Sequence, residues 1–270
     1  MPIGEPSGVT VRPHTHPTAI IHPAARIAAS CTIGPFCIVG EEVEMGEGCE
    51  LLSHVVLKGP TKIGGHNRVF PFTTLGLEPQ DLKFKGEKTR LEIGDNNVIR
   101  ESVTVHRGTP AGGGLTRIGS NCLIMAYAHI AHDCEIADNV IMANAATLAG
   151  HVTVEEYAVV GALCPVHQFV RVGAYSYVGG GTTITQDVLP FSLTSAKREV
   201  RAFGMNSVGL ERKGFSKERL RKIHSAYRIL LSSKMNVGDA LAKIKAHGDL
   251  GEDVERLVKF VEGSERGILK

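Results

Sequence analysis

An aliphatic residue recurs at every sixth position over much of the sequence. The pattern covers residues 21–75, resumes over 93–105, and continues over 118–184, which makes about 25 hexads. A helix repeats every 3.6 residues and a strand every two, so a period of six excludes a regular helix and indicates a short strand followed by a corner. Three such units close a coil of 18 residues, and the hexads therefore predict about eight stacked coils.

A second slot, four residues after each aliphatic position, holds small or β-branched residues. All six cysteines occupy it, namely Cys31, Cys37, Cys49, Cys122, Cys134 and Cys164. We therefore interpret the cysteines as small buried residues, not as zinc ligands or a disulfide framework. The composition agrees with this interpretation, because 31 Gly, no Trp and only 5% aromatic residues favour a core of small and aliphatic side chains.

Two interruptions of the repeat, at residues 76–92 and 107–117, predict loops, and loops that leave a regular solenoid usually carry function. After residue 190 the hexads stop and helical signals begin. Ser216 is placed to cap a helix ending near residue 233, Asn236 a helix ending near residue 247, and a third helix is expected over 252–262. We thus expect a leader over 1–17, a repeat domain over 18–190, and a small helical domain over 191–270 that packs against it.

Hydropathy and charge bound the function classes. No segment approaches the roughly 18 to 20 uninterrupted apolar residues that span a bilayer, and no secretory signal is evident, so we expect a cytoplasmic protein without an integral membrane segment. The formal charge is +2, but residues 195–270 hold 17 Lys and Arg against 10 Asp and Glu. This basic region predicts an anionic partner.

Histidines gather on one strip of the predicted coils. Residues 18 apart lie above one another on adjacent coils, so His132, Gly150 and Gln168 form one column, with His151 and His167 beside it. In a repeat otherwise filled by small and aliphatic residues, such a cluster favours a functional site. A neutral imidazole can accept a proton from a hydroxyl, and a backbone N–H on the next coil can stabilise an oxyanion.

Longer motifs carry a more specific resemblance. They are PQDLKF at 79–84, RESVTVHRGT at 100–109, AHIAHDC at 128–134, LAGHV at 148–152, HQF at 167–169 and GLERKGF at 209–215. Through them the chain from about residue 17 onward resembles the UDP-N-acetylglucosamine acyltransferases of the hexapeptide-repeat family. The resemblance implies an all-β left-handed parallel β-helix with a small α-helical C-terminal domain, assembled as a homotrimer. It also implies transfer of a 3-hydroxyacyl group from acyl carrier protein to a UDP-amino sugar, UDP-N-acetylglucosamine, at the first step of lipid A synthesis.

The resemblance implies roles for single residues as well. His132 would be the general base on the sugar hydroxyl, Asp133 would orient it, and Gly150 would donate the oxyanion N–H. The residues expected to hold the sugar, the acyl hydroxyl or the phosphates are Asp81, Lys83, His129, His151, His167 and Gln168. Asn206 and Arg212 would contact the nucleotide end from a neighbouring subunit.

Three positions allow more than one interpretation. His106 opens a loop and either binds substrate or only shapes that loop. Gly180, one coil above Ala162, either leaves room for an acyl groove or serves a turn. Lys213 stands where the family commonly has a second Arg, and a Lys lacks the bidentate fork of Arg, so we do not assign it as a specific diphosphate ligand.

Other functions remain as alternatives. A different hexapeptide acyltransferase, using acetyl-CoA or acting on a related UDP-amino sugar, is disfavoured by the loop with Asp81 and Lys83 and by the helical tail. A zinc-dependent hydratase would use His129, His132 and His151 as ligands. A purely structural solenoid is disfavoured by the polar column. We expect no cofactor, no bound metal and no nucleic-acid partner, while acyl chain length and the choice of hydroxyl or amine at the sugar 3-position stay open.

Overall fold

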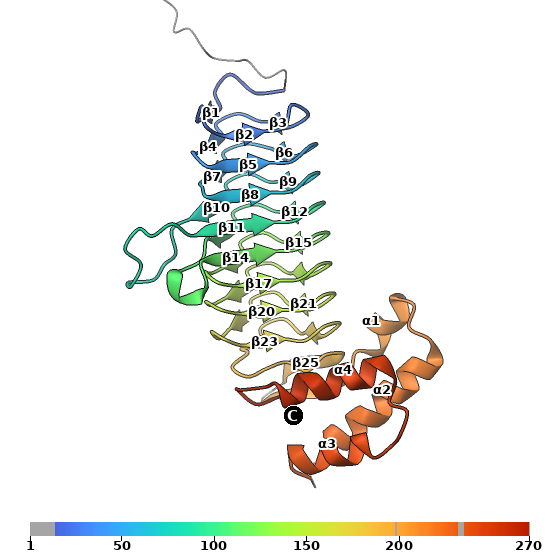
Figure 1. The fold of residues 1–270 in the computed structure, drawn as a ribbon. Helices are drawn as coiled ribbons and strands as arrows, with labels where there is room; N and C mark the ends of the chain where they lie inside the picture. The colour runs from blue at the N-terminus through green and yellow to red at the C-terminus, as the bar shows by residue number, and fades with distance from the viewer. Residues whose placement is uncertain (1–13, 198, 232–234, 270) are drawn as a thin grey trace, which may run out of the picture.

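The computed structural model describes residues 14–197, 199–231 and 235–269, so most of the expected leader, residues 1–13, lies outside the described residues. Over residues 20–178, short strands wind into a left-handed parallel β-helix whose coils stack along one axis (Figure 1). Each coil gives one strand to each of three parallel sheets, which form the faces of a triangular prism. Two of these sheets have eight strands each in the described chain, so the predicted β-helix of about eight coils is confirmed.

Most strands have only two residues, as a six-residue repeat requires. The first sheet contains β1 (Ile20–Ile21), β4 (Ile38–Val39), β7 (Val56–Leu57), β10 (Thr74–Leu77), β13 (Thr104–His106), β16 (His129–Ile130), β19 (Thr147–Leu148) and β22 (Pro165–Val166). The second contains β2 (Arg26–Ile27), β5 (Val43–Met45), β8 (Thr61–Ile63), β11 (Arg90–Ile93), β14 (Leu115–Ile118), β17 (Glu135–Ile136), β20 (Thr153–Val154) and β23 (Arg171–Val172). The third contains β3 (Thr32–Ile33), β6 (Glu50–Leu51), β9 (Arg68–Val69), β12 (Val98–Ile99), β15 (Leu123–Ile124), β18 (Ile141–Met142), β21 (Val159–Val160), β24 (Tyr177–Val178), β25 (Ser192–Lys197) and β26 (Glu199–Met205).

The two sequence slots fill the prism. The aliphatic residue of each hexad points inward, as Ile130 and Leu148 do on paired strands β16 and β19, and both side chains are completely buried. The second slot lines the corners, where all six cysteines are buried, as expected. Their thiols donate to backbone carbonyls 15 residues further along the chain, for example Cys134 Sγ to Ala149 O at 3.2 Å. This pairing favours a small donor at a corner, which explains why cysteine fits the slot.

Both interruptions leave the prism at the same edge. Residues 78–89 connect β10 to β11, and residues 107–114, with a 3₁₀ turn at Pro110–Gly112, connect β13 to β14. Each connection runs from the first sheet to the second, and Figure 1 shows both loops projecting on one side of the prism. We call the stack of connections from the first to the second sheet the loop corner. On the next three coils the loop corner consists of residues 131–134, 149–152 and 167–170.

The C-terminal region begins with an element that the sequence did not predict. Strands β25 and β26 form an antiparallel hairpin that extends the third sheet. The helices α1 (Ser207–Arg212), α2 (Lys217–Leu230), α3 (Val237–Lys245) and α4 (Gly251–Glu262) follow. Ser216 and Asn236 cap α2 and α3 as expected, by accepting hydrogen bonds from Arg219 N and Asp239 N. The expected end of the first helix, residue 233, lies outside the described residues.

Helix α4 lies against the end of the prism (Figure 1). Arg171 on β23 stacks its guanidinium 4.2 Å from the ring centroid of Phe260 and donates from Nη2 to the Phe260 carbonyl at 2.8 Å. The helices therefore form a base under the last coil. In the part of the chain that the structure describes, no helix has both the length and the apolar character needed to cross a membrane.

Candidate active site

His132 and Asp133 form a hydrogen-bonded pair at the loop corner, directly after β16. His132 Nδ1 lies 2.7 Å from Asp133 Oδ2, and the Asp133 side chain is only 1% exposed. An ionised carboxylate can only accept a hydrogen bond, so Nδ1 carries the proton and Nε2 is left with its lone pair. The imidazole, 16% exposed, is thus prepared to accept a proton at Nε2 from a group on the outer surface of the prism.

The glycine-rich loop over 107–114 wraps around Asp133. Thr109 donates its backbone N–H to Asp133 Oδ1 at 2.7 Å and its hydroxyl to Oδ2 at 2.6 Å. A β-carbon on Gly112 would come within 2.1 Å of the Asp133 carboxyl carbon, so only glycine lets the loop close this tightly. Sequence reasoning missed Thr109, although it is the last residue of the RESVTVHRGT motif.

Gly150 lies one coil beyond His132, as the 18-residue spacing predicted. The His151 N–H donates to the His132 carbonyl at 3.0 Å, which fixes the two coils in register. The His132 ring fills the space in which a Gly150 side chain would stand. His151 sets its ring perpendicular to that of His132, with 5.2 Å between centroids, and stacks on Phe169 at 4.4 Å. The structure therefore brings His132, Asp133, Gly150 and His151 together.

His129 faces outward from β16, beside this group. Its Nδ1 lies 2.7 Å from the Thr104 hydroxyl, and its ring is 5.4 Å from that of His106. Burial lowers the pKa of His129, and the nearby His106 and His132 lower it further. His106 Nδ1 also bonds to the Glu78 carbonyl at the start of the first loop. His106 thus both contacts the loop and lies beside a candidate substrate residue.

The loop over 78–89 carries Asp81 and Lys83 away from the prism. Asp81 Oδ1 accepts a hydrogen bond from the Lys83 N–H at 2.9 Å, which shapes the turn, and the Lys83 side chain is exposed. Arg107 anchors the base of the loop, because its buried guanidinium donates to the Gly76 carbonyl at 3.1 Å and lies 5.6 Å from the Phe84 ring centroid. The structure places the loop on the coils just before His132.

His167 and Gln168 occupy the loop corner one coil beyond Gly150, and both are exposed. The Phe169 N–H donates to the Gly150 carbonyl at 3.2 Å, so this turn stacks on the preceding one. Gly180 lies elsewhere, on the connection from the third sheet toward the first, where an added β-carbon would meet the Ala162 carbonyl at 3.3 Å. Within one chain, Gly180 is therefore not at the corner that holds His132.

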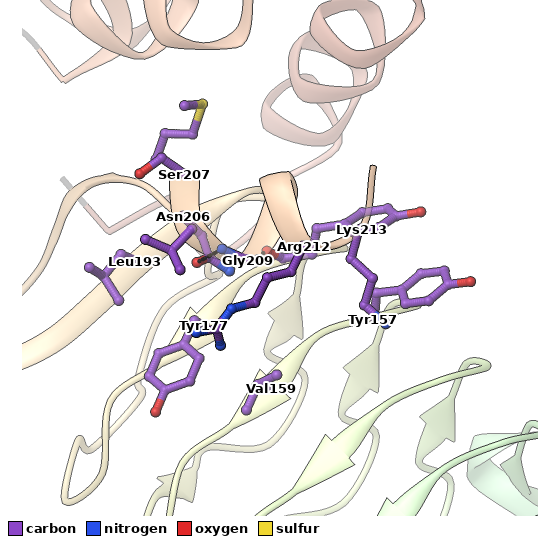
Figure 2. A pocket seen from close by; sticks show the side chains of 12 residues that line it. Tyr157, Val159, Tyr177, Leu193, Asn206, Ser207, Gly209, Arg212 and Lys213 are labelled. Carbon is purple, nitrogen blue, oxygen red and sulfur yellow. Dashed lines mark hydrogen bonds between the residues drawn. The ribbon is translucent and has the colours of Figure 1, made fainter. Parts of the chain in front are cut away.

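Asn206 and Arg212 line a cleft of about 420 Å³ on the third sheet (Figure 2). Asn206 caps α1 by accepting from the Gly209 N–H at 3.2 Å and donates to the Tyr175 carbonyl at 3.2 Å. The exposed Arg212 side chain reaches over Val159 toward Tyr177 in Figure 2. This cleft lies on the third sheet, whereas His132 follows β16, a strand of the first sheet. One chain therefore does not bring Asn206 and Arg212 close to His132.

The Lys213 ammonium, which we left unassigned, lies 4.4 Å from the Tyr157 ring centroid at the edge of the same cleft. This contact accounts for a point charge at that position without a phosphate.

His132, Asp133 and His151 each present one potential metal ligand, and these atoms lie within 4.8 Å of one another. In the ligand set considered for the zinc-dependent alternative, Asp133 takes the place of His129. The His132 Nδ1 proton already bonds to Asp133, whose two oxygens both accept from Thr109. His132 Nδ1 and the Asp133 carboxylate are therefore engaged in hydrogen bonds, which a metal bound between them would have to displace.

Known proteins resemble this chain in both of its parts. Residues 187–269 match the family model described as UDP N-acetylglucosamine O-acyltransferase, domain 2, and residues 115–150 match the bacterial transferase hexapeptide model. The acyl-[acyl-carrier-protein]–UDP-N-acetylglucosamine O-acyltransferase of Alkalilimnicola ehrlichii is 49% identical over 199 residues, which cover 74% of this chain and 77% of that protein.

Solved structures extend the similarity to the whole fold. The UDP-N-acetylglucosamine acyltransferase of Francisella novicida superposes with a TM-score of 0.92 at 38% identity, covering 94% of this chain and 93% of that one. The UDP-N-acetylglucosamine O-acyltransferase of Moraxella catarrhalis gives a TM-score of 0.91 at 41% identity, covering 95% of this chain and 100% of that one. Prism, loops and helical base are thus arranged alike in these proteins.

Proposed function

The chain belongs to the family of UDP-N-acetylglucosamine O-acyltransferases, and we propose that it transfers a 3-hydroxyacyl group from acyl carrier protein to the 3-hydroxyl of UDP-N-acetylglucosamine. This reaction is the first step of lipid A synthesis, and the family resemblance predicted from the motifs is confirmed. A cytoplasmic location, where acyl carrier protein supplies the donor, is part of the proposal.

His132 is the proposed general base, and its bond to the buried Asp133 is the observation that carries this assignment. Nε2 takes the proton from the sugar hydroxyl as the oxygen attacks the thioester carbonyl. When the tetrahedral intermediate collapses, the carbon–sulfur bond breaks and the proton passes from His132 to the departing thiolate. Asp133 keeps Nδ1 protonated throughout and stabilises the imidazolium that forms in between, as in other base–carboxylate pairs.

Gly150 is the proposed oxyanion donor. No described residue accepts a hydrogen bond from its backbone N–H, and the His132 ring occupies the space beside it where a β-carbon would stand. A thioester carbonyl carbon in reach of the hydroxyl held by His132 would thus place its oxygen near a donor that is not engaged elsewhere. A donor fixed in this way costs no reorganisation when charge develops in the transition state.

Substrate contacts are proposed along the loop corner, where donors and acceptors extend from the first loop to the last coil. These residues are Asp81, Lys83, His106, His129, His151, His167 and Gln168. They surround His132 on the preceding, same and following coils, which suits a substrate lying parallel to the prism axis. The spacing supports contacts to the sugar, the phosphates and the acyl chain, whereas the expected partner of the nucleotide end, Asn206 with Arg212, lies away from this corner within one chain.

A homotrimer would supply that partner. We propose that Asn206 and Arg212 of a neighbouring subunit contact the nucleotide, because their cleft lies on a different sheet from His132 in one chain. Threefold closure then gives three equivalent sites. It also covers the loop corner, which is otherwise open to solvent, and this cover excludes water from the oxyanion contact. Gly180, also remote from His132 within one chain, would line the acyl groove across the same interface.

Mass spectrometry of reaction products tests the function. Purified protein is incubated with 3-hydroxyacyl and unsubstituted acyl carrier proteins of several chain lengths, with acetyl-CoA as an alternative donor. UDP-N-acetylglucosamine and its 3-amino analogue serve as acceptors. We expect an ester product from the hydroxyacyl carrier protein and UDP-N-acetylglucosamine. Acetyl transfer from acetyl-CoA, or exclusive acylation of the amino analogue, would assign the chain to one of the alternative acyltransferases.

A further inference from the structure

The segment after α4 returns to the last coil beside His167 and Gln168. Arg266 Nη1 lies 2.7 Å from His167 Nδ1 and also donates to the Gln168 carbonyl. These contacts join residues 98 and 99 positions apart in the sequence. The tail thereby places a guanidinium directly behind two candidate substrate residues.

Other bonds hold this segment on the prism without Arg266. Asp187, 1% exposed, donates its N–H to the Gly267 carbonyl at 3.1 Å and accepts from the Leu269 N–H at 3.1 Å. Its carboxylate also accepts from the Ser264 hydroxyl and from Arg171 Nε, each at 2.9 Å. Removal of the Arg266 guanidinium alone should therefore leave the tail in place.

The contact also determines which nitrogen of His167 carries its proton. A guanidinium has donors and no acceptor, so the His167 Nδ1 that faces it must be unprotonated. His167 Nδ1 lies 3.1 Å from the Gln168 carbonyl as well, but an Nδ1–H directed there would oppose the Arg266 N–H at 2.7 Å. The arrangement in which Arg266 donates to both acceptors avoids this clash. His167 is then neutral, with its N–H at Nε2.

We propose that Arg266 is a positioning residue that holds His167 as the Nε2–H tautomer, so that this exposed ring donates a hydrogen bond to an oxygen of the bound substrate. The proposal rests on the acyl transfer proposed above. A neutral imidazole freed from Arg266 could carry its proton on either nitrogen and would present a donor or an acceptor to the substrate. Arg266 removes that choice before the substrate binds.

Two variants separate the hydrogen bond from the bulk of the side chain. Arg266→Met keeps the stem but loses every donor, whereas Arg266→Lys keeps a donor on a shorter, more flexible stem. We expect kcat/KM to fall roughly threefold to tenfold in Arg266→Met, the range for one neutral hydrogen bond, which here is the bond that His167 is proposed to donate to the substrate. Arg266→Lys should recover part of this loss. Glu265→Gln, at the exposed neighbouring position, is the matched control and should retain wild-type kinetics and unfolding midpoint.

A double-mutant cycle tests whether Arg266 acts through His167. In a His167→Ala background, Arg266→Met should have little further effect on kcat/KM. An equal loss in both backgrounds would overturn the proposal and leave Arg266 as a general support. A donor whose acyl chain lacks the 3-hydroxyl shows which substrate oxygen accepts the hydrogen bond from His167. With this donor, the loss of kcat/KM in Arg266→Met disappears if His167 binds the 3-hydroxyl of the acyl chain, and persists if His167 binds the nucleotide sugar.

The tautomer itself is measured on the whole protein by ¹⁵N NMR after histidine labelling, with His167→Ala used for assignment. We expect the wild type to show protonated Nε2 and unprotonated Nδ1 at His167, and Arg266→Met to show a mixture. Protonated Nδ1 in the wild type would overturn the proposal. Because this measurement needs no substrate, it remains decisive even if the acyl-transfer assays show a different reaction.

Discussion

The imidazole of His132 lies so close to Gly150 that a β-carbon built on the glycine would come within 2.5 Å of the ring's Cε1 atom. The base and the proposed oxyanion donor are therefore mutually dependent, because the ring can take its position only if residue 150 has no side chain. This contact is set by the in-register stacking of two adjacent coils, which the His151 N–H to His132 carbonyl bond fixes at 3.0 Å.

Substitution Gly150→Ala should consequently displace the base while keeping the backbone N–H. We expect kcat to fall by about 10² or more, within the usual contribution of a positioned general base, with circular dichroism unchanged. Gly238→Ala, in α3, is a suitable control because its β-carbon would approach Asn236 Oδ1 only to 3.4 Å. Normal turnover in Gly150→Ala would show that His132 does not act from the position seen here.

Thr109 offers a test of the role of Asp133 in orienting His132, because Thr109 contacts the Asp133 carboxylate and is not among the residues proposed to contact substrate. Thr109→Val removes the hydroxyl donor to Asp133 Oδ2 but keeps the side chain's shape. Hydrogen bonds to charged groups contribute about 1.5–3 kcal/mol, so kcat should fall roughly 10- to 100-fold while KM changes little. Thr109→Ser should restore most of the loss. A KM effect without a kcat effect would mean that the loop binds substrate directly.

Much of the site was predictable because the repeat turns sequence spacing into height along the prism. His132 and Gly150 are 18 residues apart, and nothing is inserted between their coils, so the arithmetic places them in contact. The same arithmetic places Gly180 next to Ala162. The arithmetic also separates Gly180 from His132, because their spacing of 48 residues is not a multiple of 18 and therefore puts them at different corners.

Contacts that depend on inserted loops or on the tail were not predictable. Thr109 meets Asp133 across the loop over 107–114, where the 18-residue spacing fails. Arg266 meets His167 only because α4 returns the chain to the prism. The β25–β26 hairpin was missed for a related reason, since its strands follow a hairpin pattern and not a period of six.

The lowered pKa of His129 predicts a pH dependence of stability. Burial favours the neutral ring in the folded protein, whereas the unfolded chain binds a proton near pH 6.5. Between the lowered folded pKa and 6.5 the unfolded state holds more protons, so the free energy of unfolding decreases as the pH falls through this window. His129→Asn should reduce that decrease, as measured by urea unfolding at pH values above and below 6.5. Identical pH profiles for variant and wild type would contradict it.

Salt should weaken the step that involves the acyl donor. Residues 197–222 hold nine Lys and Arg against three Glu, and Arg212, Lys213 and Arg221 are exposed. Such a surface attracts an acidic carrier protein, so kcat/KM for the acyl carrier protein should fall as ionic strength rises. Arg221→Gln should lower the slope of this dependence, whereas Lys243→Gln in α3 should not. A flat salt profile in the wild type would exclude this surface from donor recognition.

Subunit mixing tests the proposed shared site. His132→Ala removes the base at the loop corner, and Arg212→Ala removes a charge from the cleft on the third sheet, so each homotrimer should be inactive or strongly impaired. After equal mixing and verified subunit exchange, about a quarter of the interfaces combine an intact His132 from one chain with an intact Arg212 from its neighbour. We therefore expect recovery toward roughly a quarter of wild-type kcat for random threefold assembly. If both residues served the same chain's site, exchange would restore nothing. A fully active monomer in light scattering at assay concentration would also contradict the shared site, because in one chain Arg212 lies over the third sheet, away from the loop corner that holds His132.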